Sequence, residues 1–256
     1  PHPRLVIDPN NQDLRMLSSI EEKAKAVYDL GVDFVLVLPF TTEFSQMSPR
    51  DFVAKILVEQ LHVNTIVIGY DHRFGRNREG DFNSLVALSK EFHFDVEEIP
   101  ASEIDAIAIS STRIRKALSN KLLQEANQLL GKPYILSGIV VQGKQLGRTI
   151  GFPTANVEIN DPYKLIPPRG VYAGYCLVEN QTHKMVCNIG VRPTVDGEQL
   201  TIEAHIFGFE KNIYNQAISL FLVQYLRNEQ KFDSIEALKS QILLDAQQAQ
   251  TLVNLD

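Results

Sequence analysis

Apolar residues are spaced in two different ways along this chain, and the change comes near Pro133. Before that residue, stretches with helical spacing of apolar side chains alternate with short, continuous apolar stretches, a pattern typical of strands covered on both faces. After it, the apolar stretches are short and are separated by Gly, Pro, Asn and Asp, as in chains with many turns between strands. The spacing therefore predicts two domains, an α/β domain over residues 1–131 and a β domain over residues 132–256.

The first domain is expected to contain a parallel sheet. The segment "SSIEEKAKAVYDLG" combines serine caps with glutamates three residues later and ends at Gly31, so it predicts a helix; further helices are expected from Ser48 and over 81–92. Between them, "VDFVLVLPF", "TIVIG" and "FDVEEIP" predict strands. Apolar strands separated by helices form parallel sheets covered on each side, as in nucleotide-binding domains. Helices over "SSTRIRKALSN" and "KLLQEANQLLG" are expected to complete this domain.

The second domain is expected to be a small barrel or sandwich with one helix after it. Its predicted strands are "YILSGIVV", "GVYAGYCLVE", "KMVCNIGV", "LTIEAHIFGF" and "AISLFLVQYL". Near the C-terminus, Asp233 as a cap precedes apolar residues at helical spacing. This pattern predicts a C-terminal helix that packs against the β structure.

The composition narrows the classes of partner. A formal charge of −6 disfavours a general nucleic-acid binder, although the basic runs "HRFGRNR" and "GKQLGR" could attract a nucleotide phosphate. No apolar run is long enough to span a bilayer, so no membrane partner is expected. Two cysteines without a His or Cys cluster predict neither a disulfide framework nor a zinc site, and favour a cytoplasmic location. The sequence leaves the oligomeric state open.

The segment "GRTIGFPTAN" contains a candidate metal site. Pro153 pushes the residue before it toward extended geometry, so a strand is expected to follow, with Thr154 and Asn156 on one face. Their hydroxyl and amide oxygens suit a magnesium ion that takes its remaining ligands from water and substrate phosphates. Flexible backbone and positive charge for a triphosphate would come from Gly143, Lys144, Gly147 and Arg148. The alternative is an ordinary β-hairpin turn, in which these residue types are common for conformational reasons.

Glu203 is a candidate general base. In "TIEAHIFGF" the strand alternation puts Glu203 and His205 on the face opposite to Ile202, Ala204 and Ile206. A carboxylate there could accept the proton of a substrate hydroxyl that attacks a γ-phosphate. The alternative is a solvated carboxylate on the outer face of a strand.

The first domain offers candidate phosphate contacts. Gly69 and Asp71 follow a predicted strand directly, where open α/β sheets bind ligands. A predicted helix begins at the hydroxyls of Ser111 and Thr112, with Arg115 close by, and could hold a phosphate. A plain helix cap and solvated arginines are the alternatives.

The order of these motifs along the chain resembles the bacterial bifunctional riboflavin kinase/FAD synthetase family. The resemblance covers nearly the whole chain and is most specific in "GFPTAN" followed by the E-x-H strand. It implies a C-terminal kinase, built on a six-stranded β-barrel, that converts riboflavin and ATP to FMN. It also implies a Rossmann-like N-terminal nucleotidyltransferase that joins FMN to the AMP of a second ATP, giving FAD and pyrophosphate.

The resemblance also assigns residue roles. It implies that Thr154 and Asn156 bind Mg²⁺ and phosphate and that Glu203 is the base for the ribityl 5′-hydroxyl. It places Gly143, Lys144, Arg148, Gly151 and Pro153 in the ATP loop, and Arg227 and the segment from Phe232 to Asp245 beside the flavin. For adenylyl transfer it implies nucleotide contacts from Gly69, Asp71, Ser111, Thr112 and Arg115.

Two departures from the family pattern affect these expectations. The family's Asp-Phe-Arg-Phe-Gly is here Asp71-His72-Arg73-Phe74-Gly75, which could change flavin contacts slightly. The family's leading Gly-x-Phe-Asp-Gly-x-His-x-Gly-His element does not occur in the sequence, so the 256-residue polypeptide is expected to lack adenylyltransferase activity while its kinase is complete.

Two alternatives to the bifunctional enzyme are a riboflavin kinase with a vestigial first domain and a flavin- or nucleotide-binding module without turnover.

Overall fold

The computed structural model describes residues 6, 14–69, 71–99, 110–143, 145–194 and 197–255. The chain divides into two compact units. The first unit comprises Pro1–Leu14 and Phe34–Ala108, and the second, here the barrel unit, comprises Arg15–Asp33 and Ile109–Asp256. The units therefore do not follow one cut along the sequence, and the division at residue 131 stays a prediction about the domains.

The first unit contains a short parallel sheet with helices beside it. Strands β1 (Thr65–Gly69) and β2 (Asp95–Ile99) pair in parallel, joined by α5 (Phe82–Phe92), whose cap is Asp81. The shorter helical segments are α3 (Thr42–Ser45), α4 (Pro49–Asp51), η1 (Phe52–Val58) and η2 (Arg76–Arg78). The helix predicted from Ser48 begins there as expected, because the Ser48 hydroxyl accepts a hydrogen bond from the Asp51 amide. Parallel pairing of the predicted strands is confirmed.

One predicted strand is wrong. The segment "VDFVLVLPF", residues 32–40, is not a strand, and the Phe34 side chain in it is 88% exposed. Nor is the two-stranded sheet covered on both faces within the described residues, since Val67 and Ile99 are exposed. A continuous apolar run forms a buried strand only if a neighbouring strand pairs with its backbone and other elements cover its faces. The described part of the chain provides neither for residues 32–40.

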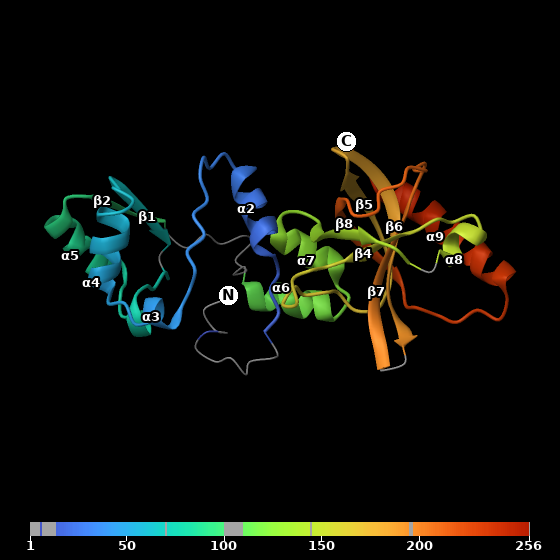
Figure 1. Cartoon of the computed structure of the whole chain (residues 1–256), viewed down its shortest axis with the longest axis horizontal. Helices are drawn as coiled ribbons and strands as arrows, with labels where there is room; N and C mark the ends of the chain where they lie inside the picture. The colour runs from blue at the N-terminus through green and yellow to red at the C-terminus, as the bar shows by residue number, and fades with distance from the viewer. Residues whose placement is uncertain are drawn as a thin grey trace. The chain divides into compact units, whose positions relative to one another are not determined.

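The barrel unit is built on six antiparallel strands that close in the order β3-β4-β7-β6-β5-β8. Figure 1 shows β4 to β8 of this barrel with α9 beside them. The strands are β3 (Tyr134–Val141), β4 (Ala155–Glu158), β5 (Gly170–Val178), β6 (Gln181–Thr194), β7 (Gly197–Ile206) and β8 (Ala217–Arg227). Alternate residues fill the interior, among them Leu136, Tyr172, Cys187, Ala204 and Leu220, all buried. The predicted six-stranded barrel is confirmed, and the choice between barrel and sandwich is settled by the closure between β3 and β8.

The predicted C-terminal helix is α9 (Ile235–Leu252), and it packs on the outer face of β5 and β6. Ala249 and Val253 are buried there against Val171 and Val186. The cap is Ser234, whose hydroxyl accepts from the Ala237 amide, and not Asp233 as predicted. Ser and Asp are nearly equivalent caps, so the sequence pattern alone does not choose between neighbours.

Three helices from the first half of the sequence belong to the barrel unit. They are α2 (Ile20–Tyr28), α6 (Ser111–Ser119) and α7 (Leu123–Leu130), the last of which packs against β3 and β8. Glu22 of α2 forms a buried ion pair with Lys164, which follows β4. No helix in the described ranges is both long and apolar enough to cross a membrane.

Candidate active site

Strand register in the barrel brings polar side chains from four strands into one row. Asn156 on β4 lies opposite Glu203 on β7, which lies opposite Asn188 on β6. The row continues through Val171 on β5 to Arg227 on β8. On β4, β7, β6 and β5 the neighbouring side chains Val157, Ala204, Cys187 and Tyr172 point into the barrel core, so Asn156, Glu203, Asn188 and Val171 lie on the outer face. Residues far apart in sequence thus share one surface.

A cavity of about 370 Å³ opens over this row. It is lined by residues that the sequence predicted as metal ligands, general base and flavin contacts: Thr154, Asn156, Glu203, Arg227 and Phe232. Its apolar lining comes from Val171 and Val186 on the barrel, from Ile150 and Phe152, and from Leu238 and Ile242 on α9. An adjoining cavity of about 510 Å³ is lined by Arg148, Pro153 and Thr154. Thr154 belongs to both cavities and marks their junction.

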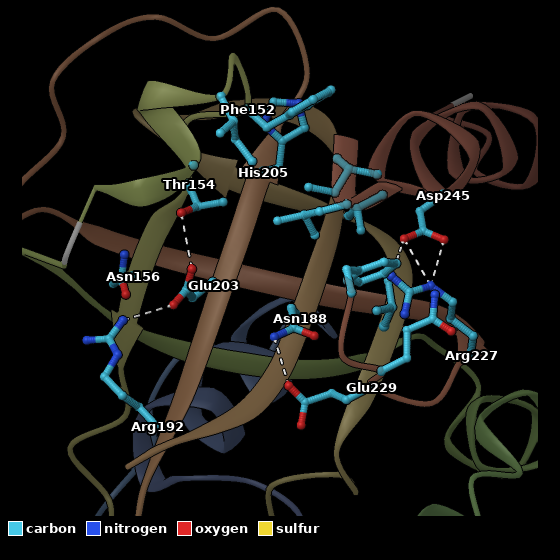
Figure 2. Close-up of a pocket in the computed structure, with 18 of the residues that line it drawn as sticks. Phe152, Thr154, Asn156, Asn188, Arg192, Glu203, His205, Arg227, Glu229 and Asp245 are labelled. Carbon is cyan, nitrogen blue, oxygen red and sulfur yellow. Dashed lines mark hydrogen bonds and ion pairs between the residues drawn. The ribbon is translucent and has the colours of Figure 1, made fainter. Parts of the chain in front are cut away.

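Glu203 is held by two partners inside the first cavity (Figure 2). The Thr154 hydroxyl donates to Oε2 at 3.3 Å, and the Arg192 guanidinium donates to Oε1 at 3.3 Å. The side chains of Glu203 and Arg192 are each 28% exposed. Glu203 is therefore a carboxylate held by two partners with access to the cavity, and not a freely solvated one.

The Glu203 charge also acts on the barrel interior. Cys187 lies in the core on the strand paired with β7, and burial, followed by the nearby Glu203 carboxylate, raises the pKa of its thiol to about 12. Cys176 is likewise a buried free thiol. Both thiols are packing residues and have no place in the cavity.

Thr154 and Asn156 meet the requirements for a magnesium site that shares its ligands with a substrate. Thr154 directly precedes β4 and Asn156 lies on it, so both oxygens face the cavity from one edge. Gly143 on the neighbouring segment leaves room for the Asn156 amide, because a Cβ at position 143 would collide with it. No group of three or more His, Cys, Asp or Glu that could hold a metal exists among the described residues. The Thr154 hydroxyl and the Asn156 amide supply neutral hard oxygens, which fit Mg²⁺ better than zinc.

The predicted ATP loop contains a short helix and is held by hydrogen bonds. Gly147 and Arg148 lie in the short helix α8 (Leu146–Thr149), and the Phe152 amide donates back to the Gly147 carbonyl at 2.8 Å. His205 Nδ1 donates to the Pro153 carbonyl at 2.8 Å, which fixes the segment to β7. Gly151 has φ +89° and faces open space. Lys144 lies outside the described residues.

Arg227 and Phe232 lie at the α9 end of the cavity. The Arg227 guanidinium donates to Asp245 of α9 from Nε at 2.9 Å and from Nη2 at 2.7 Å, and its Cζ lies 5.8 Å from the Phe232 ring centroid. Asp245 is buried and also accepts from Gln241. Arg227 is therefore a structural clamp between β8 and α9 as well as a cavity residue.

Several cavity residues could not be found from the sequence. Asn188, Arg192, Glu229 and Asp245 line the same space as Glu203. Asn188 lies in the predicted strand "KMVCNIGV" and Arg192 directly follows that segment, but their position beside Glu203 depends on the β6–β7 register. Asp245 ends the segment that the resemblance places beside the flavin, whereas Glu229 carries no sequence signal of its own.

The predicted nucleotide contacts of the first half belong to different compact units. In the first unit, Gly69 ends β1 and Asp71 follows it, with the His72 ring stacked on Phe74. In the barrel unit, Ser111, Thr112 and Arg115 lie in α6, whose cap is Ser110. The Arg115 Nε donates to the Arg15 carbonyl at 2.7 Å. These contacts therefore stay predictions.

Comparison with known proteins identifies relatives along the whole chain. Residues 130–253 match the riboflavin kinase family and residues 1–113 match the FAD synthetase family. A bifunctional riboflavin kinase/FMN adenylyltransferase of Listeria monocytogenes is 40% identical over 248 residues, which are 96% of this chain and 78% of the relative. The protein of the same name in Haemophilus influenzae is 43% identical, over 91% of this chain and 73% of the relative. A crystal structure from Streptococcus pneumoniae, described as a macrolide-efflux protein, is 30% identical with a TM-score of 0.85, over 98% of this chain and 81% of that one.

Proposed function

Because the chain belongs to the family of bifunctional riboflavin kinase/FMN adenylyltransferases, we propose that it makes flavin cofactors in two steps. The barrel unit phosphorylates riboflavin with ATP to give FMN. The second step of this family, transfer of AMP from ATP to FMN to give FAD and pyrophosphate, is proposed for the region that matches FAD synthetase only together with the family's histidine element, which the 256 residues do not contain. The observation that carries the kinase assignment is the meeting of Thr154, Asn156 and Glu203 in one cavity.

Glu203 acts as the base in the kinase step. Its carboxylate accepts the proton of the riboflavin 5′-hydroxyl while that oxygen forms a bond to the γ-phosphorus and the bond from phosphorus to the ADP oxygen breaks. Arg192 keeps one carboxylate oxygen in place, and the Thr154 hydroxyl orients the other. The charged pair is only partly exposed, so the carboxylate stays aligned without losing contact with the substrate.

Thr154 and Asn156 would hold Mg²⁺ together with the ATP phosphates. The ion, when bound, neutralises charge on the transferring phosphoryl group. The adjoining cavity at Arg148 and Pro153 would accept ATP, because Thr154 connects it to the cavity that contains Glu203. The isoalloxazine ring would lie against the apolar surface between the barrel and α9, near Arg227 and Phe232.

Adenylyl transfer is proposed to use the residues expected from the family pattern. Within the first unit, Gly69 and Asp71 at the carboxyl end of β1 would contact the nucleotide. Within the barrel unit, Ser111, Thr112 and Arg115 of α6 are separate candidates for a phosphate contact. Cys176 and Cys187 are free thiols and fit a reducing compartment, so we place this enzyme in the cytoplasm.

The kinase assignment is tested by incubation of the chain with riboflavin, ATP and Mg²⁺, followed by chromatographic separation of FMN and FAD. We expect FMN from the unchanged chain and, for Glu203→Gln, a rate lower by at least about 100-fold, the usual contribution of a general base. Glu198→Gln is the matched control, because Glu198 lies on the same strand in an exposed ion pair with Arg169. An unaltered rate in a folded Glu203→Gln variant would refute the assignment, and bound flavin without FMN would indicate a binding module.

A further inference from the structure

We propose that Asn188 and Glu229 bind the hydroxyl groups of the ribityl chain and so select a neutral polyol-bearing flavin as the substrate of the kinase. This inference rests on the proposed kinase function and concerns residues next to its base. Asn188 Nδ2 donates to Glu229 Oε1 at 3.3 Å, and both residues line the cavity. Figure 2 shows Asn188 between Glu203 and Arg227, with Glu229 beside it.

The position of the pair follows from strand register. Asn188 is the direct partner of Glu203 on the adjacent strand, so it lies one strand spacing, about 4.8 Å, from the base. If the 5′-hydroxyl meets Glu203, the middle of the ribityl chain lies over Asn188. The next position in the row is Val171, where the apolar part of the cavity begins. The polar pair thus lies between the reacting hydroxyl and the surface suited to the ring.

The charge of Glu229 indicates what it binds. The other carboxylates in this cavity are paired, Glu203 with Arg192 and Asp245 with Arg227. Within the described residues, Glu229 has no cationic partner and makes its hydrogen bond to a neutral amide. An unpaired carboxylate repels the phosphates of ATP but accepts hydrogen bonds from hydroxyl groups. A neutral polyol is therefore the ligand that suits this end of the cavity.

Gly190 provides independent support, because it makes room for Glu229. A Cβ at position 190 would collide with Glu229 Oε1 and would lie 3.0 Å from Asn188 Nδ2. Gly190 lies on β6 on the same face as Asn188, and its φ is not in the left-handed region. Its backbone therefore does not require glycine, and the absence of a side chain leaves room for the carboxylate beside the amide.

The hydrogen-bonding capacity of the pair matches a row of hydroxyls. The bond between the two side chains uses one of the two Asn188 N–H groups and one Glu229 oxygen. The amide carbonyl, the second N–H and the second carboxylate oxygen can each meet one hydroxyl, as donor or acceptor. The pair therefore offers both hydrogen-bond donors and acceptors, and a chain of hydroxyl groups can use both.

The test uses the full chain with Glu229→Gln, Asn188→Ala and Gly190→Ala. We expect KM for riboflavin to rise by about tenfold in each of the three variants, because each one weakens the hydrogen bonds from the pair to the ribityl hydroxyls, including those to the Glu229 carboxylate. The kcat should change by less than about threefold. Gly190→Ala keeps both polar side chains and only displaces Glu229, whose flexible end can move, so this variant separates position from chemistry. Glu198→Gln is the control and should leave KM unchanged.

Binding measurements distinguish the polyol from the ring. Flavin fluorescence quenching should show weaker riboflavin binding in all three variants and unchanged binding of lumiflavin, which has the same ring without the ribityl chain. Unchanged riboflavin affinity in Glu229→Gln and Asn188→Ala would overturn the inference, and so would an equal loss for both flavins. The fluorescence measurement of binding does not need turnover. A chain that binds riboflavin through Asn188 and Glu229 but makes no FMN would therefore contradict the proposed kinase activity, while the proposed contacts to the ribityl chain would still hold.

Discussion

At the scale of single residues, Gly143 shows how the absence of a side chain shapes the site. The space that a Cβ would take at this position is filled by the amide group of Asn156. Gly143 was expected to serve as flexible backbone for ATP, whereas the structure supports a steric role. Its function is thereby linked to that of the proposed magnesium ligand.

We predict that Gly143→Ala lowers kinase kcat/KM for MgATP by about tenfold, because Asn156 must turn away from its position, at a cost on the order of one hydrogen bond. Steady-state rates at varied MgATP would measure this. Asn156→Ala should cause a similar loss, and the double variant should be little worse than either single one, because residues in contact are not additive. Additive losses would show that the two residues act separately.

At the scale of elements, the position of α9 determines one wall of the flavin cavity. Leu238 and Ile242 of this helix line the cavity, and the contact that fixes the helix to β8 is the pair of Arg227 with Asp245. The Asp245 side chain is 4% exposed. Such a pair holds the helix in a defined place only if both partners are present.

We predict that Asp245→Asn raises KM for riboflavin by about tenfold and lowers the free energy of unfolding by about 3 kcal/mol, since the Arg227 charge loses its buried partner. Urea unfolding and riboflavin kinetics measure the two effects. Glu236→Gln, at an exposed position in the first turn of the same helix, is the control. If KM stays unchanged while stability falls, α9 does not form the flavin wall.

At this scale the sequence pattern predicted elements well where local signals determine them. The capping box at Ser19, the helix over 81–92 and the strands of the barrel were found from spacing alone. The strand predicted over 32–40 failed because pairing is a property of neighbours, which the segment itself does not encode. The ATP segment became the helix α8 for a similar reason, since its turns are fixed by contacts to Phe152 and β7.

At the scale of the whole molecule, the barrel depends on a helix that lies far from it in the sequence. Glu22 of α2 accepts from Lys164 Nζ, from the Ser19 amide and from the Ser137 amide at the start of the barrel. Lys164 is 1% exposed and also lies over the Tyr134 ring. Burial lowers the pKa of Lys164, and the Glu22 charge opposes that shift.

We predict that Glu22→Gln lowers the free energy of unfolding of the barrel unit by about 3–5 kcal/mol, because it leaves a buried ammonium without its anion. Since the pKa of Lys164 then lies further below its usual 10.5, the unfolded state binds more protons between the two values. The decrease in the free energy of unfolding that Glu22→Gln causes should therefore become smaller as the pH rises from 7 toward 10.

Urea unfolding followed by tyrosine fluorescence would measure this loss, since the chain has no tryptophan and seven of its eight tyrosines lie in the barrel unit. Glu125→Gln is the control, because Glu125 forms a more exposed pair with Arg113. Adding Lys164→Met to Glu22→Gln should recover part of the stability. A loss that is independent of pH would mean that Lys164 keeps its proton without Glu22.

The sequence by itself indicated the two kinds of fold and marked Thr154, Asn156 and Glu203 as candidate site residues, because strand alternation and motif order are local properties of the chain. Only the tertiary structure decided that Arg192, Asn188 and Glu229 stand beside that carboxylate, and that α2 supports the barrel. The physical reason is that strand register, barrel closure and buried ion pairs depend on contacts between segments up to 142 residues apart. Periodicity reveals which face of a strand is buried, and the packed chain determines which side chains are its neighbours.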